Sequence, residues 1–319
     1  MIYSDWWANL LVDLSVFLLA VILDRTLPEP PERIHPVVWT GKLLNRLGRP
    51  TLPRDRAAFL YGMLVACTVV AGVGALCWLI MVGLAELGVI AYLIGSVALL
   101  RSSFTMRGLV AAGELTRKSL LEGDLDQARS RAGALVSRDR STLSEPLIAA
   151  AAIESIAENT TDSFISPWLM FALLGPAGAI TYRVANTLDS MWGKRGRFEY
   201  LGKTAARFDD ALNFLPARLC SLLMIGAGAI FALPWQRGAA VMRRDQQITE
   251  SPNAGWTMAA MAGLLGRRLE KQGHYILGAE FPEPAASDID TANRLAKGVA
   301  MLGLPVAIAL LTLRHWLAG

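Results

Sequence analysis

The sequence predicts an all-α polytopic integral membrane protein, a helical bundle whose polar helices face the cytoplasm. Charged residues make up 18% of the 319 positions, below the roughly 25% of soluble domains, and the mean hydropathy is +0.39. Residues 59–100 carry a single charged side chain, that of Glu86. No segment alternates apolar and polar residues as a half-buried strand does. These observations favour helices in a membrane, without strands, in one membrane-embedded domain over residues 1–319.

Three membrane crossings are predicted in the first hundred residues. Residues 6–23 form one apolar run, interrupted only by Asp13, and an acid at this depth should face protein or water rather than lipid. Both a structural and a functional role remain open for Asp13. As one helix, residues 59–100 would be about 63 Å long, twice the thickness of the hydrocarbon core. They therefore predict two crossings with a turn at residues 83–88.

Three later segments are weaker candidates for crossing a membrane. Residues 164–182 are uncharged but contain two prolines, and residues 212–233 contain Pro216 and Arg218. Residues 298–313 are shorter than the about 20 residues that a spanning helix needs. Each segment is compatible with a crossing, a re-entrant helix or a helix in the interface.

The distribution of lysine and arginine predicts the orientation. Residues 24–58 carry seven basic side chains and the linker at Glu86 carries none, so residues 24–58 and 101–163 are expected in the cytoplasm. A single crossing by residues 164–182 would place the six basic residues of 183–211 outside. A re-entrant or interfacial pair of helices removes this conflict and is the favoured arrangement.

Three X-Pro pairs predict where polar helices begin, because proline is well suited to the first helical position. They are His35-Pro36, Glu145-Pro146 and Ser251-Pro252. The basic residues form no block with interleaved aromatics, which argues against nucleic acid as a partner.

The stretch "AAAIESIAENTTDSFISPW", residues 150–168, places Glu154, Glu158 and Asp162 four residues apart. A continuous α-helix would put the three carboxylates on one face, where they repel one another unless a cation lies against them. In a soluble protein a solvated acidic face would be the ordinary interpretation. Here the neighbours are alanine, isoleucine and an apolar run.

Further acids, amides and arginines interrupt the apolar sequence in "YRVANTLDSMWG" and "AARFDDALNFLPARL". Carboxylate and amide oxygens without histidine or thiolate suit Mg²⁺, and arginine suits phosphate or carboxylate. The pattern therefore predicts a Mg²⁺–phosphate site, with an internal salt-bridge network as the alternative. The candidates for Mg²⁺ or amine contacts are Glu154, Glu158, Asp162, Asp189, Asp209 and Asp210, with Glu154, Glu158, Asp209 and Asp210 as metal ligands. The candidates for binding substrate are His35, Asn159, Arg183, Asn186, Arg207, Asn213, Arg218 and Asn253.

One segment resembles a nucleotide-binding motif without matching its spacing. "GRFEYLGKT", residues 196–204, is similar to the phosphate-binding loop G-x-x-x-x-G-K-T, but it has five residues between the glycines instead of four. We therefore reject it as such a loop. On the residues alone, two classes remain open: a membrane enzyme that handles a phosphorylated substrate with Mg²⁺, and a transporter or sensor whose buried charges gate ions.

These same segments resemble the CobD/CbiB family of cobalamin biosynthesis, the adenosylcobinamide-phosphate synthases. The resemblance rests on "LDRTLPEPPERIHPVVWTG", "AAIESIAENTTDSF", "YRVANTLDSMWG", "AARFDDALNFLPARL" and "SPNAGWTMAAMAGLLGRRL", which occur in the order of the family and cover roughly residues 10–305.

The resemblance implies an integral enzyme of the cytoplasmic (inner) membrane with its active site on the cytoplasmic side. The implied reaction joins adenosylcobyric acid to aminopropanol or aminopropanol phosphate through an amide bond, with ATP and Mg²⁺. The expected partners are this corrinoid, the amine and the lipid membrane, and a homo-oligomer stays open. The alternative is a transporter or regulatory sensor of the same fold without ligase activity.

Overall fold

A computed structural model describes residues 5–48, 55–135, 143–193 and 198–319. The chain divides into two compact units, each made of stretches that are separate in the sequence. Met1–Thr105, Ser166–Leu212 and Pro305–Gly319 form unit 1, and Met106–Ile165 and Asn213–Leu304 form unit 2. The predicted all-α membrane fold is confirmed. The single domain over residues 1–319 stays a prediction.

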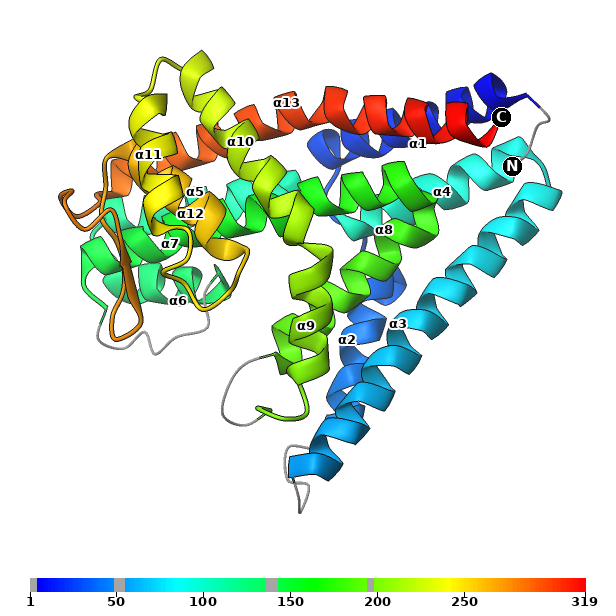
Figure 1. Cartoon of the computed structure of the whole chain (residues 1–319), viewed down its shortest axis with the longest axis horizontal. Coiled ribbons are helices and arrows are strands. Elements are labelled where there is room, and N and C mark those ends of the chain that lie inside the picture. The colour runs from blue at the N-terminus through cyan, green and yellow to red at the C-terminus, as the bar shows by residue number, and fades with distance from the viewer. Residues whose placement is uncertain (1–4, 49–54, 136–142, 194–197) are drawn as a thin grey trace. The chain divides into compact units, whose positions relative to one another are not determined.

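Unit 1 is a bundle in which α3 and α4 both pack against α8. Its elements are α1 (Trp6–Thr26), the short turn η1 (Glu32–Ile34), α2 (Pro36–Leu47), α3 (Asp55–Glu86), α4 (Val89–Ser103), α8 (Ser166–Trp192), α9 (Lys203–Leu212) and the end of α13 (Ala286–Ala318). Figure 1 shows α2 and α9 beside the same half of α3. Gly175 interrupts α8 with a positive φ of 72°, directly before Pro176, which cannot donate a backbone hydrogen bond.

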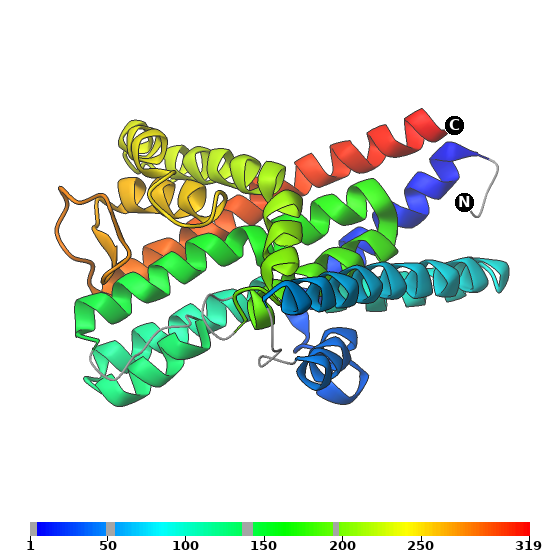
Figure 2. The same ribbon diagram turned by 60° about the horizontal axis from the view of Figure 1, so that its bottom comes forward.

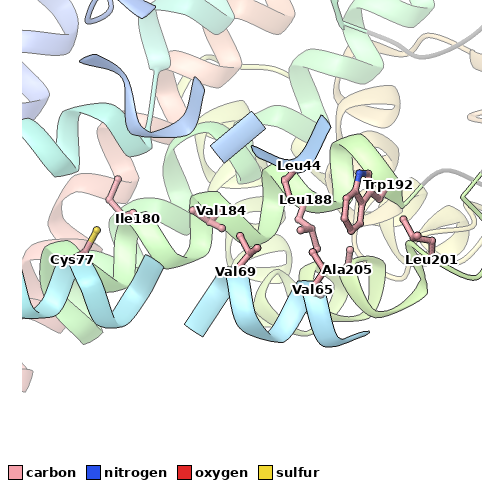
Figure 3. Packing of buried hydrophobic residues seen from close by; sticks show 11 residues of the cluster. Leu44, Val65, Val69, Cys77, Ile180, Val184, Leu188, Trp192, Leu201 and Ala205 are labelled. Atoms are coloured by element: carbon pink, nitrogen blue, oxygen red, sulfur yellow. The ribbon is translucent and has the colours of Figure 1, made fainter. Parts of the chain in front are cut away.

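The core of unit 1 joins α2, α3, α8 and α9. Figure 3 shows Val65 and Val69 of α3 against Val184 and Leu188 of α8. Gly62 of α3 lies so close to the segment before α9 that a Cβ there would come within 2.0 Å of the Leu201 carbonyl oxygen. This packing fixes the positions of α8 and α9, which carry six of the fourteen predicted site residues.

Unit 2 is built around α7, whose residues 149–152 are buried alanines. Figure 2 shows α7 between the α5–α6 pair and α12, which it contacts on either side. The elements are α5 (Met106–Leu121), α6 (Leu125–Leu135), α7 (Glu145–Thr160), a π-helical turn η2 (Thr161–Ile165), α10 (Phe214–Ile230), α11 (Trp235–Asp245), α12 (Ala254–Leu265), β1 (Leu269–Lys271), β2 (Tyr275–Leu277) and most of α13.

The prediction of no strands is wrong at one place. β1 and β2 form an antiparallel hairpin in which Leu269 pairs with Leu277 and Lys271 with Tyr275. Strands of three residues are too short to show alternation. The signal that was available is Gly273 in the connecting turn, which adopts a φ of 73°, a conformation that favours glycine.

Within the described residues, five helical runs are long and apolar enough to cross a membrane: Trp6–Thr26, Asp55–Glu86, Val89–Leu121, Glu145–Trp192 and Ala286–Ala318. The first predicted crossing coincides with the first of these runs, and the predicted turn between α3 and α4 is confirmed. α10 passes the same test only together with α9, across the break at Asn213. The protein is therefore a multi-pass membrane protein, and the re-entrant or interfacial arrangement after residue 163 and the orientation stay predictions.

Two of the three predicted helix starts are confirmed, at Pro36 and Glu145. The third is wrong by two residues, because α12 begins at Ala254 rather than Pro252. The Ser251 hydroxyl still accepts hydrogen bonds from the backbone N–H groups of Asn253 and Ala254, at 3.2 and 3.3 Å. Ser251 thus turns the chain ahead of the helix instead of opening it.

Candidate functional site

The predicted site residues fall into two groups, one in each unit. Unit 1 holds His35 before α2; Arg183, Asn186 and Asp189 on α8; and Arg207, Asp209 and Asp210 on α9. Unit 2 holds Glu154, Glu158 and Asn159 on α7; Asp162 in η2; Asn213 and Arg218 at α10; and Asn253 before α12.

In unit 1, a polar chain links α8 to α9. Arg183 Nη1 donates to Asn186 Oδ1 at 3.1 Å, and Asn186 Nδ2 donates to Asp209 Oδ1 at 3.1 Å. Arg183 and Asn186 are three residues apart and therefore share a face of α8. The Asn186 side chain is buried, so its amide holds the guanidinium and the carboxylate in a fixed arrangement.

The other acids of unit 1 lie at the ends of the same two helices. Arg207 on α9 pairs with Asp210 at 3.7 Å, although the Arg207 side chain is largely exposed. The Asp189 carboxylate occupies the space beside Gly193, where a Cβ would come within 1.8 Å of its Oδ1 atom. Gly193 therefore leaves room for Asp189 at the end of α8.

His35 lies half-buried near charges that the sequence did not single out. Arg101, at the end of α4, forms a buried ion pair with Asp24 at 3.3 Å and donates to the Leu27 carbonyl oxygen at 3.4 Å. Burial lowers the pKa of His35; Glu29 opposes this, and Arg183 and Arg101 lower the pKa further. The only available signal for Arg101 was its place as the first charge after the long apolar run.

The lowered pKa of His35 predicts a pH-dependent contribution to stability. The unfolded chain takes up a proton near pH 6.5 while the folded protein resists it, so this stability is present above that pH. It is lost as the pH falls from 6.5 through the lower folded pKa. We expect the unfolding midpoint of His35→Gln to fall less between pH 7 and pH 5 than that of the unmodified protein. His274→Gln, at an exposed position, is the control, and an unchanged slope in His35→Gln would contradict the prediction.

In unit 2, the three acids predicted on one helical face have different surroundings. Glu154 is buried, Glu158 is exposed and Asp162 is half-buried. The assumption of a continuous α-helix is wrong for Asp162, because α7 ends at Thr160 and Asp162 lies in the π-helical turn η2. The wider π turn rotates the side chains that follow, and such turns occur frequently at functional sites.

The buried acid Glu154 has a partner that sequence reasoning missed. The Tyr275 hydroxyl of β2 donates to Glu154 Oε2 at 3.3 Å. Tyr275 was overlooked because the hairpin that carries it was not predicted. Asn159, by contrast, donates to the backbone oxygen and to the hydroxyl of Ser155 in its own helix, at 3.0 Å each.

Arg218 and Asn253, two of the candidates for binding substrate, lie in contact in unit 2. Arg218 Nη1 donates to Asn253 Oδ1 at 3.3 Å, and the guanidinium carbon lies 3.5 Å from the Phe214 ring centre and 4.8 Å from that of Trp256. Two aromatic faces thus restrict the arginine side chain. Asn213 is buried at the start of α10.

The donor set bears on how a metal ion could be held. No group of three or more His, Cys, Asp or Glu side chains in the described ranges is arranged to hold a metal by itself. Mg²⁺ is usually held by one or two carboxylates together with water and substrate phosphates. Asp209 and Asp210 on α9, and Glu154 and Glu158 on α7, are adjacent or one turn apart and fit this manner of binding.

Comparison with known proteins finds a matching family model and several similar proteins named CobD. The family model of the CobD/Cbib protein matches residues 17–301. A protein of Dehalococcoides mccartyi named cobalamin biosynthesis protein CobD is 42% identical over 270 residues, covering 84% of this chain and 87% of its own. The protein of that name in Chromobacterium violaceum is 38% identical over 313 residues, covering 91% and 94%. A probable one in Methanothermobacter thermautotrophicus is 41% identical over 267 residues, covering 83% and 87%. No solved structure matches.

Proposed function

The chain belongs to the CobD/Cbib protein family, and on this premise we propose that it is an ATP-dependent ligase that forms an amide bond. The substrates would be adenosylcobyric acid and either aminopropanol or aminopropanol phosphate. The product would be adenosylcobinamide or its phosphate. The observation that carries the proposal is the hydrogen-bonded chain Arg183–Asn186–Asp209, in which a guanidinium of the kind that suits phosphate is linked to a carboxylate.

The chemistry explains why such residues are needed. A carboxylate is a poor acceptor for an amine, so a carboxylate oxygen of the corrinoid would first attack the γ-phosphorus of ATP, releasing ADP and leaving an acyl phosphate. The amine nitrogen then attacks the acyl carbon, and inorganic phosphate leaves. The proton lost by the nitrogen goes to a carboxylate of the protein. No step requires a nucleophilic side chain, and both require that phosphate charge be neutralised.

The side chains take different roles in this scheme. Arg183 and Arg207 would bind phosphate oxygens, and Arg218, held by its aromatic neighbours, would bind the carboxylate of the corrinoid or a phosphate. Glu154, which is buried, would accept the proton of the amine. His35, whose pKa is lowered by burial, would be a hydrogen-bonding contact. Asn159, Asn186, Asn213 and Asn253 would orient these groups.

Mg²⁺ would supply electrostatic stabilisation of the phosphate oxygens when it is bound. Asp209 and Asp210 would hold it together with the phosphates of the substrate, because the carboxylates of the described residues do not form a complete set of ligands by themselves. Glu154 and Glu158 are the alternative pair, and in that case Glu154 would not be the proton acceptor. Asp162 and Asp189 would contact the metal ion or the amine.

The same proposal places the enzyme in the cytoplasmic membrane with its active site on the cytoplasmic side. The corrinoid, ATP and the amine are polar molecules and would reach the site from water. The concentration of basic residues in 24–58 supports a cytoplasmic location for that segment. The proposal is compatible with a monomer and with a homo-oligomer.

The test uses the full-length protein in detergent, supplied with adenosylcobyric acid, Mg²⁺-ATP and one of the two amines. A gain in product mass that equals one amide, and that depends on ATP, would support the ligase and identify the amine. The absence of product with either amine, from protein shown to be folded, would contradict the proposal. It would then favour a transporter or sensor, a class for which the ion pair of the buried Asp13 with Arg314 provides charges within membrane helices.

A further inference from the structure

The β1–β2 hairpin of unit 2 is attached at both of its ends. On the side of β2, the Gly278 backbone N–H donates to Asp245 Oδ2 at 2.8 Å, and Arg244 bridges Asp245 at 2.6 Å and Glu280 at 2.9 Å. On the side of β1, Arg267 pairs with Asp288 at 2.9 Å. The hairpin is thus tied to the end of α11 and to the first turn of α13.

The hairpin also packs onto α7. β1 contacts α7, and the paired residues Leu269 and Leu277 are completely buried. Because side chains alternate along a strand, Leu277 and Tyr275 point to the same face of the hairpin. This packing, together with the polar attachments, places the Tyr275 ring against α7.

The Tyr275 hydroxyl meets Glu154 at the contact with α7. It donates to Glu154 Oε2 at 3.3 Å and lies 3.8 Å from the Met258 sulfur of α12. Glu154 is 3% exposed and lies between Ile153 and Ser155, which are also buried. A carboxylate in such surroundings requires hydrogen-bond donors, and its orientation depends on where those donors lie.

We propose that Tyr275 is a positioning residue for Glu154: the anchored hairpin holds the Tyr275 hydroxyl so that the Glu154 carboxylate is oriented toward the amine. This inference rests on the proposed function, in which Glu154 accepts the proton of the amine. Tyr275 itself does not touch the substrate. Its hydroxyl retains its own proton while the other carboxylate oxygen of Glu154 takes the proton that the nitrogen loses.

The experiment compares Tyr275→Phe with the unmodified protein in the ligation assay. We expect kcat to fall about tenfold, the effect of losing one hydrogen bond to a charged group, while the KM values for both substrates stay within about twofold. The combination with Glu154→Gln should be no slower than Glu154→Gln alone, because Tyr275 acts only through Glu154. Tyr61→Phe is the matched control, since it removes a tyrosine hydroxyl that donates to the Leu47 carbonyl oxygen at 3.0 Å in unit 1.

A second measurement does not depend on product formation. The unfolding midpoints of Tyr275→Phe, Glu154→Gln and the double variant should be non-additive, because the two side chains are bonded to each other. 3-Fluorotyrosine at position 275 keeps the ring and the hydroxyl while making the phenol more acidic, so it remains informative if phenylalanine does not fold. It should change the pH profile of kcat, and an unchanged profile would overturn the inference.

The outcomes separate the inference from the proposed function. If Glu154→Gln turns over like the unmodified protein, the role of Glu154 in the proposed function fails, and the inference fails with it. If Glu154→Gln is inactive while Tyr275→Phe keeps its full kcat, only the inference is overturned. A purely structural role for Tyr275 would lower the unfolding midpoint and leave kcat per folded molecule unchanged.

Discussion

Replacing Asp13 with alanine is expected to lower the free energy of unfolding in detergent by about 3–5 kcal/mol, the usual effect of removing one partner from a buried ion pair. Asp13 is buried on α1. It accepts a hydrogen bond from Tyr92 at 3.2 Å, contacts His315 Nε2 at 3.0 Å and forms an ion pair with Arg314. Without the carboxylate, the partly buried Arg314 guanidinium would lose its counter-charge and keep its hydrogen bond to the Phe171 carbonyl oxygen. Denaturant unfolding of the purified protein measures the effect.

Two further variants sharpen this test. Glu86→Ala removes an acid from the exposed end of α3 and should change stability by less than about 0.5 kcal/mol. Combining Asp13→Ala with Arg314→Met removes both charges, so the double variant should lose less stability than the sum of the single variants. If Asp13→Ala is no more harmful than Glu86→Ala, the cluster does not stabilise unit 1.

Replacing Asp209 with asparagine is expected to lower the kcat/KM of ligation by about 100-fold or more, the effect of losing one preorganised electrostatic contact in a site. The substitution keeps the shape of the side chain but removes the negative charge beside the Arg183–Asn186 pair. The carboxylate proposed to hold Mg²⁺ is lost with it, so the Mg²⁺ concentration for half-maximal rate should rise. Initial rates measured over a series of Mg²⁺ concentrations test both effects.

Two further variants test the specificity of this effect and the link that Asn186 makes between Arg183 and Asp209. Glu86→Gln makes the same acid-to-amide change at an exposed position of unit 1 and should leave the rate unchanged. Asn186→Ala breaks the link between Arg183 and Asp209 while keeping both charges. Its loss of rate should be smaller than that of Asp209→Asn. Full activity in Asp209→Asn would remove Asp209 from the site.

Features that depend on neighbouring residues in the chain were predictable. The start of α2 at Pro36 follows from the restricted φ of proline, which suits the first helical position. The turn between α3 and α4 at residues 87 and 88 follows from the thickness of a membrane, which a single 42-residue helix would exceed. The candidate residues were found because carboxylates, amides and arginines are rare in apolar sequence.

Features that depend on contacts between distant segments were not predictable. Asp13 could be recognised as a buried acid, but its partners Arg314 and His315 lie 301 and 302 residues further along the chain. Tyr275 meets Glu154 across 121 residues, on a hairpin whose strands are too short to show a pattern. The π turn at Asp162 widens the helix in a segment whose composition is ordinary for an α-helix.

The sequence by itself determined the class of the protein, an all-α membrane protein of the CobD/Cbib family, and the chemical types of its candidate residues. Apolar content and residue spacing are local quantities, and the partition of apolar residues into a membrane depends on little else. Only the tertiary structure decided that Asn186 joins Arg183 to Asp209, that Glu154 is buried while Glu158 is exposed, and that Tyr275 reaches Glu154. Hydrogen bonds depend on distance and direction, which arise only when helices from separate parts of the chain pack together.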